Sequence, residues 1–316
     1  MGGGSGYMES DENDFASWSV HPESSMPAVS TGPDLESLLD LVRGRRIVVL
    51  AGAGCSTESG IPDYRGPDAR PRAPVQFQDF MRTEAARVRY WARSAAGWAR
   101  FSAAQPNDAH AALARMEEGG AVRGIITQNV DGLHGAAGSR NVVELHGSLS
   151  SVRCMACGAV GPRDDFQRRL LAANREWAGE MAVRAESGEV RSAPDGDADL
   201  PAALLEAFRV PACERCGGVI KPDVVFFGEN VPAERVEQAW NLFGEAEVLL
   251  VAGSSLTVYS GRRFIYRAQQ DGVPIAIVNI GPTRADEVAA VKVEGRLGDV
   301  LPRLADALFI PANCAE

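Results

Sequence analysis

A run of four apolar β-forming residues, Ile47 to Leu50, leads directly into the turn Gly52-Ala53-Gly54. A strand that is apolar at consecutive positions is typical of a parallel sheet buried on both faces. Stretches long enough for crossover helices separate this run from similar ones at 125–127, 142–143, 248–252 and 275–278. The alternation predicts an α/β fold: a doubly wound, parallel-sheet, Rossmann-like domain.

The length of 316 residues favours about two domains at roughly 150 residues each. Residues 34–150 and 218–316 are predicted to form the Rossmann-like domain, with a helical insertion at about 67–101. Residues 162–209 interrupt the strand–helix rhythm, and residues 151–217 are predicted to form a smaller inserted zinc-binding and helical domain. Within the helical insertion, 81–101 is rich in Ala, Arg and aromatic residues and is expected to be helical. Within the smaller domain, 187–199 is expected to be a loop.

The composition of the chain changes after Pro33, where a stretch without apolar periodicity gives way to an expected helix. Gly, Ser and Pro dominate residues 1–33, which lack apolar periodicity, so this stretch is predicted to be a disordered tail. Asp34 is expected to cap an amphipathic helix that ends at Gly44.

Charge and hydropathy limit the partners. Lys plus Arg number 32 against 42 for Asp plus Glu, a net charge of −10, which disfavours binding to nucleic acid. No apolar run approaches the roughly 20 residues of a membrane span, so no membrane association is expected. Residues 1–33 contain acidic residues but no Lys or Arg, unlike a secretory signal or transit peptide, and the expected location is the cytoplasm.

Four of the six cysteines form two C-x-x-C pairs, each followed by Gly: Cys154 with Cys157, and Cys213 with Cys216. Two such knuckles are typical of a four-thiolate structural zinc site, with two disulfides or a redox C-x-x-C as alternatives. The expected cytoplasmic location favours zinc. Four thiolates leave no open coordination position, so the metal would hold a lobe together and take no part in catalysis.

The Gly-rich turn after the first strand is a candidate phosphate site. Its glycines would let a pyrophosphate approach the backbone, and Ser56 and Thr57 could cap a following helix. A tight strand–helix turn without a ligand is an equally weighted alternative for the glycines alone. The spacing is not G-x-G-x-x-G and no acidic residue ends a strand about 20 residues on, so a dehydrogenase fits poorly.

Polar residues follow two further strands: Gln128, Asn129 and Asp131 after one, and His146 after the other. Carboxyl ends of parallel strands meet at one edge of a sheet, so these side chains should converge near the Gly-rich turn. That position favours a functional over a structural role for His146. His110 and His134 are expected on helices or loops, with capping or surface roles.

At this point the chain resembles one family. Gly52-Ala-Gly54-x-Ser56, Ile61-Pro-Asp63-Tyr-Arg65, Thr127-Gln-Asn129-Val-Asp131, Leu145-His146-Gly147, the paired knuckles, Lys221 to Glu229, Gly253-Ser-Ser255 and Asn279-Ile-Gly281 occur in the order found in sirtuins, the NAD-dependent protein deacylases. Tyr64, Arg89 to Arg93 and Gly281 to Asp286 are most similar to the class II branch, which includes the mitochondrial sirtuin of animals. Cys55 departs from the more usual Ile.

The resemblance implies that NAD is consumed and that the products are nicotinamide, O-acyl-ADP-ribose and free lysine. His146 would be the catalytic base, with Asn129 and Asp131 beside the nicotinamide and its ribose. The implied cofactor positions are Gly52, Ala53, Gly54, Ser56, Thr57, Gly60, Ile61, Asp63, Tyr64, Arg65, Gln128, Asn129, Asp131, Gly253, Ser254, Ser255, Asn279, Ile280, Gly281 and Leu297.

The implied partners are acyl-lysine proteins, whose peptide would lie as an added strand between two edges of the protein. The corresponding substrate positions are Val225, Phe226, Phe227, Gly228, Glu229, Leu256, Val258 and Tyr259. Tyr90 and Arg93 form a Tyr-x-x-Arg pair that resembles an acidic-acyl site of another sirtuin branch, although a surface Arg beside a packed Tyr is the alternative. An ADP-ribosyltransferase shares all cofactor positions; a zinc-ribbon interaction module and a dehydrogenase fit less well. The oligomeric state is left open.

Overall fold

A computed structural model describes residues 33–63, 74–186, 200, 204–205 and 207–309. Its larger sheet has six parallel strands in the order β3-β2-β1-β7-β8-β9. The strands are β1 Ile47–Ala51, β2 Val122–Thr127, β3 Val142–Glu144, β7 Val248–Ala252, β8 Ile275–Asn279 and β9 Val291–Glu294. The order reverses between β1 and β7, which is the point where doubly wound sheets open a crevice for ligands.

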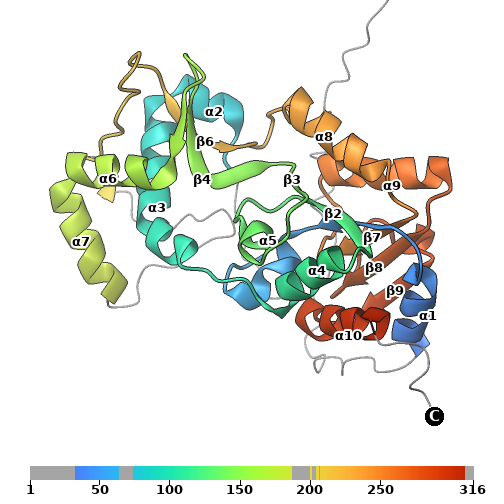
Figure 1. Cartoon of the computed structure of the whole chain (residues 1–316). Helices are drawn as coiled ribbons and strands as arrows, with labels where there is room; N and C mark the ends of the chain where they lie inside the picture. The colour runs from blue at the N-terminus through green and yellow to red at the C-terminus, as the bar shows by residue number, and fades with distance from the viewer. Residues whose placement is uncertain (1–32, 64–73, 187–199, 201–203, 206, 310–316) are drawn as a thin grey trace, which may run out of the picture.

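Helices cover both faces of this sheet (Figure 1). One face carries α1 Pro33–Val42, α4 Asp108–Glu118 and α10 Leu297–Phe309, and the other α8 Ala233–Phe243 and α9 Tyr259–Asp271. Alternate residues of β1 pack into the two cores: Ile47 and Val49 into the first, Val48 and Leu50 into the second. The continuous apolar run is therefore explained by burial on both faces, as predicted.

A smaller antiparallel sheet consists of β5 Val160–Pro162, β4 Gly147–Cys154 and β6 Ile220–Val224. It shares a core with α2 Phe77–Arg82, α3 Glu84–Ser102 and α6 Arg163–Ala173, while α7 Arg175–Glu186 follows α6 (Figure 1). Trp91 of α3 is fully buried there, and its indole N–H donates to the carbonyl of Ile220 at 3.1 Å. The predicted domain boundaries at residues 150 and 218 stay a prediction. Strand β6 lies just after the second boundary, but it pairs with β4 of the smaller sheet.

Two local expectations differ from the structure, and two others lie outside the described residues. The helix expected over 81–101 is two helices separated at Thr83, whose extended backbone breaks the helix and whose Oγ1 accepts from the N–H of Ala86 at 3.2 Å. Asp34 lies inside the first turn of α1, which begins at Pro33. The predicted tail before Pro33 and the predicted loop 187–199 lie outside the described residues. Among the described helices, none is long and apolar enough to cross a membrane.

The candidate active site and metal centre

The side chains predicted to converge do so at the carboxyl ends of β1, β2 and β7. Asn129 donates from Nδ2 to the carbonyl of Gly52 and to Ser56 Oγ, both at 3.0 Å. Ser56 Oγ donates in turn to Asp131 Oδ2 at 2.7 Å. These bonds tie the end of β2 to the Gly-rich turn and create a polar wall of amide, hydroxyl and carboxylate groups.

The Gly-rich turn presses against the end of β7. A Cβ atom on Gly52 would lie 2.7 Å from the carbonyl oxygen of Gly253, and one on Gly54 would lie 2.9 Å from the Cα of Gly253. Gly253 itself has φ +62°, in the left-handed region that favours glycine. The close contact between the two backbones at the strand-order reversal therefore requires glycine at these positions, whether or not a ligand also approaches them.

The expected capping roles of Ser56 and Thr57 are wrong. Two short 3-10 turns, Ala53–Cys55 and Thr57–Ser59, follow the glycines, and neither has a side-chain cap. Ser56 instead donates to Asp131, and Thr57 Oγ1 donates back to the carbonyl of Gly54 at 3.1 Å. A helix N-terminus therefore does not supply the anion-binding groups directly after this turn.

Further predicted cofactor positions line the adjoining strand ends. Gln128 Nε2 donates to Ser254 Oγ at 2.9 Å, and Asn279 Nδ2 donates to the carbonyls of Ile280 and Gly281 at 2.8 and 3.1 Å. Neutral amides and hydroxyls suit the uncharged ribose of a dinucleotide. Two other predicted positions are Ser255, which follows Ser254, and Leu297, which begins α10. The segment after the Gly-rich turn contains Gly60, Ile61 and Asp63, whereas Tyr64 and Arg65 lie outside the described residues.

His146 follows β3 and immediately precedes β4. Its Nδ1 lies 2.9 Å from the carbonyl oxygen of Gln128, and its Nε2 lies 2.7 Å from Ser260 Oγ. Burial lowers the pKa of His146 to about 4, and the nearby guanidinium groups of Arg263 and Arg235 act in the same direction, against the opposing bond to Gln128. The imidazole is therefore neutral at physiological pH, as a general base must be before it takes a proton.

The segment predicted to pair with substrate follows β6 and is already partly paired. Val225 N–H donates to the carbonyl of His146 at 2.8 Å, and Phe227 accepts at its carbonyl from the N–H of Phe77 at 2.9 Å. The carbonyl of Gly228 accepts from Gln78 Nε2 at 2.9 Å. These bonds hold the segment beside His146.

Lys221 anchors the same segment from inside. Its Nζ pairs with Glu229 Oε2 at 3.0 Å, donates to the carbonyls of Pro222 and Val224, and lies 4.5 Å from the ring centre of Phe226. The carboxylate of Glu229 also accepts from the N–H of Phe226 at 2.9 Å. Burial lowers the pKa of Lys221, while Glu229 opposes that shift.

The second predicted substrate edge, at 256–259, carries backbone strain. Leu256 is buried with φ +57°, and it is the one non-glycine residue with positive φ in the described part of the chain. Val258 precedes α9, and the side chain of Tyr259, the first residue of that helix, is exposed. Strained backbone of this kind is concentrated at ligand-binding sites.

Tyr90 and Arg93 both lie on α3, three residues apart. Tyr90 is 3% exposed, and its ring centre lies 5.2 Å from that of Phe226 and 5.6 Å from that of Phe80, so it supports the first substrate edge. Arg93 is half-buried.

The four knuckle cysteines form one cluster. Their Sγ atoms all lie within 4.8 Å of one another, with Cys154 and Cys216 at 3.5 Å and Cys157 and Cys213 at 3.9 Å. Four sulfurs at about 2.3 Å from a tetrahedral zinc ion would be about 3.8 Å apart, so the cluster fits that metal. All four are free thiols, as opposed to the disulfide alternative.

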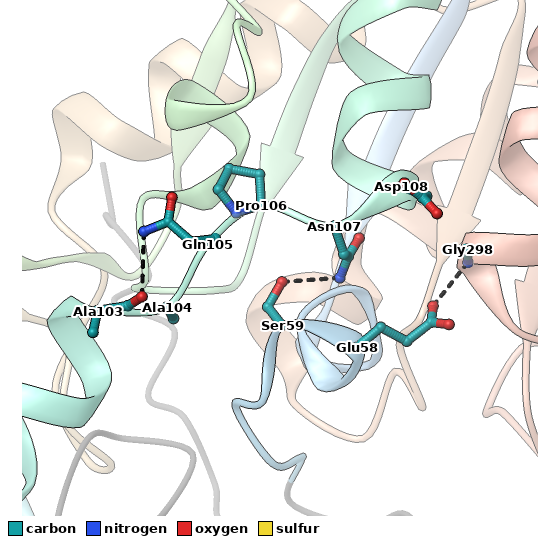
Figure 2. Close-up of a pocket in the computed structure, with 9 residues that line it drawn as sticks. All are labelled: Glu58, Ser59, Ala103, Ala104, Gln105, Pro106, Asn107, Asp108 and Gly298. Atoms are coloured by element: carbon teal, nitrogen blue, oxygen red, sulfur yellow. Dashed lines mark hydrogen bonds between the residues drawn. The ribbon is translucent and has the colours of Figure 1, made fainter.

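A pocket of about 610 Å³ lies beside the Gly-rich turn, between Glu58 and Ser59 on one side and the segment leading into α4 on the other (Figure 2). Glu58 accepts from the N–H of Gly298 at 2.9 Å. Asn107 donates from Nδ2 to Ser59 Oγ at 3.0 Å and to the carbonyl of Cys55 at 2.8 Å. Asn107, which the sequence analysis did not single out, therefore fixes this turn in place.

His110 and His134 are not on the surface. His110 takes part in the capping box of α4 with Asn107, as a capping role predicts, but it is fully buried. Its ring centre lies 4.7 Å from that of His134, which is 1% exposed and has no hydrogen-bond partner for either ring nitrogen among the described residues. Burial lowers the pKa of both, that of His134 to about 3.

Ser260 and Lys221 complete the site and were missed as functional candidates. Ser260 sits in the first turn of a helix that the sequence places 114 residues from His146. No local pattern marks such a contact. Lys221 belongs to the motif Lys221 to Glu229. Its contact with Glu229 depends on the path of the chain after β6, which the sequence pattern does not predict.

The chain matches the Sir2 family model over residues 52–260. It is 54% identical over 264 residues to NAD-dependent protein deacetylase 2 of Bradyrhizobium diazoefficiens, covering 83% of this chain and 94% of that protein. It is 49% identical over 294 residues to NAD-dependent protein deacetylase 1 of Streptomyces coelicolor, covering 92% and 94%. A solved structure of Sir2 with a p53 peptide and NAD+ superposes with TM-score 0.63 at 30% identity, covering 86% of this chain and 97% of that one. The chain therefore belongs to the Sir2 family, the sirtuins.

Proposed function

We propose that the strand-end cluster is the active site of this NAD-dependent protein deacetylase, with His146 as the general base. The observation that carries the proposal is the geometry of His146. Because the Gln128 carbonyl can only accept, Nδ1 carries the hydrogen and Nε2 keeps its lone pair. A neutral imidazole with a fixed basic nitrogen beside a polar crevice is the arrangement that deprotonation of a hydroxyl needs.

The remaining predicted residues divide the other tasks. The Gly-rich turn and the ends of β7 and β8 would hold the dinucleotide, with Asn129, Asp131 and Gln128 toward its ribose. NAD, when bound, supplies the electrophilic ribose carbon that accepts the acyl oxygen. Val225 to Glu229 and Leu256 to Tyr259 would hold the acyl-lysine peptide between them. The four-cysteine cluster would bind one structural zinc ion.

The decisive experiment is His146→Ala with an acetyl-lysine peptide and NAD, followed by mass spectrometry of the products. We expect loss of O-acetyl-ADP-ribose and of free lysine peptide by at least a hundredfold, in the range of general-base catalysis. NAD binding measured by calorimetry should remain, because His146 is not part of any of the three hydrophobic cores. The control is His21→Ala, which replaces a histidine within residues 1–33, the stretch predicted to be a disordered tail. Near-wild-type turnover in His146→Ala would exclude this role. ADP-ribosylated protein as the main product of the wild type would indicate a transferase instead.

We further propose that the chain is a class II sirtuin acting on acyl-lysine proteins in the cytoplasm, without nucleic-acid or membrane partners. The motifs at Tyr64, Arg89 to Arg93 and Gly281 to Asp286 support the class, and the absence of Lys and Arg from residues 1–33, unlike a secretory signal or a transit peptide, supports the compartment.

Acyl preference is the finer part of this proposal. Tyr90 packs against Phe226 of the substrate edge, and Arg93 lies on the same helix, so we propose that glutaryl-like acyl groups are removed faster than acetyl. Arg93→Met should slow glutaryl removal about ten- to a hundredfold more than acetyl removal, the value of a charge-assisted hydrogen bond. An equal effect on both peptides would make Arg93 structural.

A further inference from the structure

Both ring nitrogens of His146, the proposed catalytic base, have a hydrogen-bond partner. The proposed function uses the contact of Nδ1 with Gln128 but assigns no role to the contact of Nε2 with Ser260. Nε2 of His146 lies 2.7 Å from Ser260 Oγ, and the serine is 3% exposed. Since Nδ1 carries the hydrogen that Gln128 accepts, Nε2 accepts and the Ser260 hydroxyl donates.

The helix that carries Ser260 is fixed against the same glutamine. A Cβ atom on Gly261 would lie 2.6 Å from Gln128 Oε1, so the first turn of α9 rests directly on the Gln128 amide. Arg263 Nε donates to the carbonyl of Ser260 at 3.0 Å and holds that turn from its other end. His146 is thereby clamped between the backbone of Gln128 and the start of α9.

We infer that Ser260 is a positioning residue for His146, resting on the proposed role of that histidine as base. A hydroxyl is suited to this task because it can donate or accept. It donates to the lone pair of neutral Nε2. For catalysis the Ser260 hydroxyl must turn away and leave that lone pair to the hydroxyl that the base deprotonates. Once the proton has moved to Nε2, the new N–H can donate to Oγ. One side chain can therefore keep the ring in the same plane before and after proton transfer, so that the base does not reorient during turnover.

The first test needs no substrate. In the free enzyme labelled with ¹⁵N-histidine, Ser260→Ala should shift the Nε2 resonance of His146 and leave Nδ1 in place, because the bond to Gln128 remains. Ser139→Ala is the matched control. Ser139 is also buried, and its hydroxyl has no hydrogen-bond partner among the described residues, so neither resonance should move.

The second test separates binding from chemistry. Ser260→Ala should lower kcat about tenfold, the effect of losing one hydrogen bond of about 1.4 kcal/mol, with KM for NAD and peptide changed less than twofold. Ser260→Thr, which keeps the hydroxyl, should recover most of kcat. If its added methyl prevents folding, the Ala measurements alone decide.

An unchanged Nε2 resonance, an unchanged kcat, or a loss confined to KM in Ser260→Ala would overturn the inference. His146→Ala in the same assay distinguishes the two levels of failure. If His146→Ala turns over normally, the proposed base is wrong. If only Ser260→Ala does so, the base stands and the positioning role is wrong.

Discussion

Lys221 and Glu229 form an ion pair of 3.0 Å at the base of the proposed substrate edge, with the lysine side chain 4% and the glutamate side chain 20% exposed. Three oxygens surround the ammonium: the Glu229 carboxylate and the carbonyls of Pro222 and Val224. Such a charge is stable in the interior only because every donor has a partner.

Lys221→Met should therefore lower the free energy of unfolding by about 3 kcal/mol, since it leaves the largely buried carboxylate of Glu229 without its cation. The double substitution Lys221→Met with Glu229→Gln should recover most of that loss. Urea unfolding measures the stability of the single and the double variant. In Lys221→Met, KM for the peptide should also rise while KM for NAD stays constant. Arg267→Met, which breaks an exposed pair with Asp271, should change stability by less than about 1 kcal/mol. Equal losses in the single and double variants would contradict a specific pairing.

One zinc ion per chain is expected in reduced protein. Cys154→Ala or Cys216→Ala should abolish it, because each removes one of four thiolates, and elemental analysis measures the result. Cys55→Ala should keep the metal, since that buried thiol lies at the Gly-rich turn and donates to the carbonyl of Ala252. A strong chelator should unfold the smaller sheet, because metal binding supplies part of its folding free energy. Full zinc content in Cys216→Ala would refute the cluster as the site.

Acid should destabilise the fold through its buried histidines. Folded-state pKa values of about 4 for His146 and about 3 for His134 lie below the value of 6.5 expected when unfolded. The stabilising contribution of each histidine is therefore complete above pH 6.5 and is lost as the pH falls from 6.5 to about 4 for His146 and to about 3 for His134, at about 1.4 kcal/mol per pH unit.

Urea unfolding of wild type and His134→Phe at pH 7, 5.5 and 4.5 isolates one of these contributions. Neither ring nitrogen of His134 has a hydrogen-bond partner among the described residues, so the aromatic replacement removes the titration without breaking a side-chain hydrogen bond described here. The variant should lose less stability than wild type between pH 6.5 and 4.5. His21→Ala should follow the wild type, and identical pH slopes in all three proteins would argue against the burial effect.

Close backbone contact at the strand-order reversal gives a fourth prediction. In Gly253→Ala, the new Cβ would lie 2.6 Å from the Cys55 nitrogen at a φ of +62°, so both strain and steric overlap act. Gly44→Ala has a similar φ of +72° but open space, and isolates the conformational cost of about 1 kcal/mol. Thermal unfolding should show a clearly larger loss for Gly253→Ala, and NAD affinity should fall only in that variant. Equal losses would show that the two loops can separate without cost.

The sequence predicted what depends on local pattern. Continuous apolar runs located β1, β7 and β8, and the rule that parallel strand ends meet brought Asn129, Asp131 and His146 to one place. The four cysteines were predicted to cluster from spacing alone. Thr83 was missed because one residue with extended backbone interrupts an otherwise helical composition. The burial of His110 and His134 and the contact of Ser260 with His146 depend on packing between distant segments, which leaves no trace in local periodicity.

Strand β4 joins the proposed catalytic base to the four-cysteine cluster. It begins at Gly147, next to His146, and ends at Cys154, the first thiolate of the cluster. Eight residues at about 3.3 Å each span about 26 Å, and no flexible linker intervenes. A metal chelator or thiol oxidant should consequently act as a noncompetitive inhibitor: it would lower the turnover number from a distance while the dinucleotide still binds at the parallel sheet.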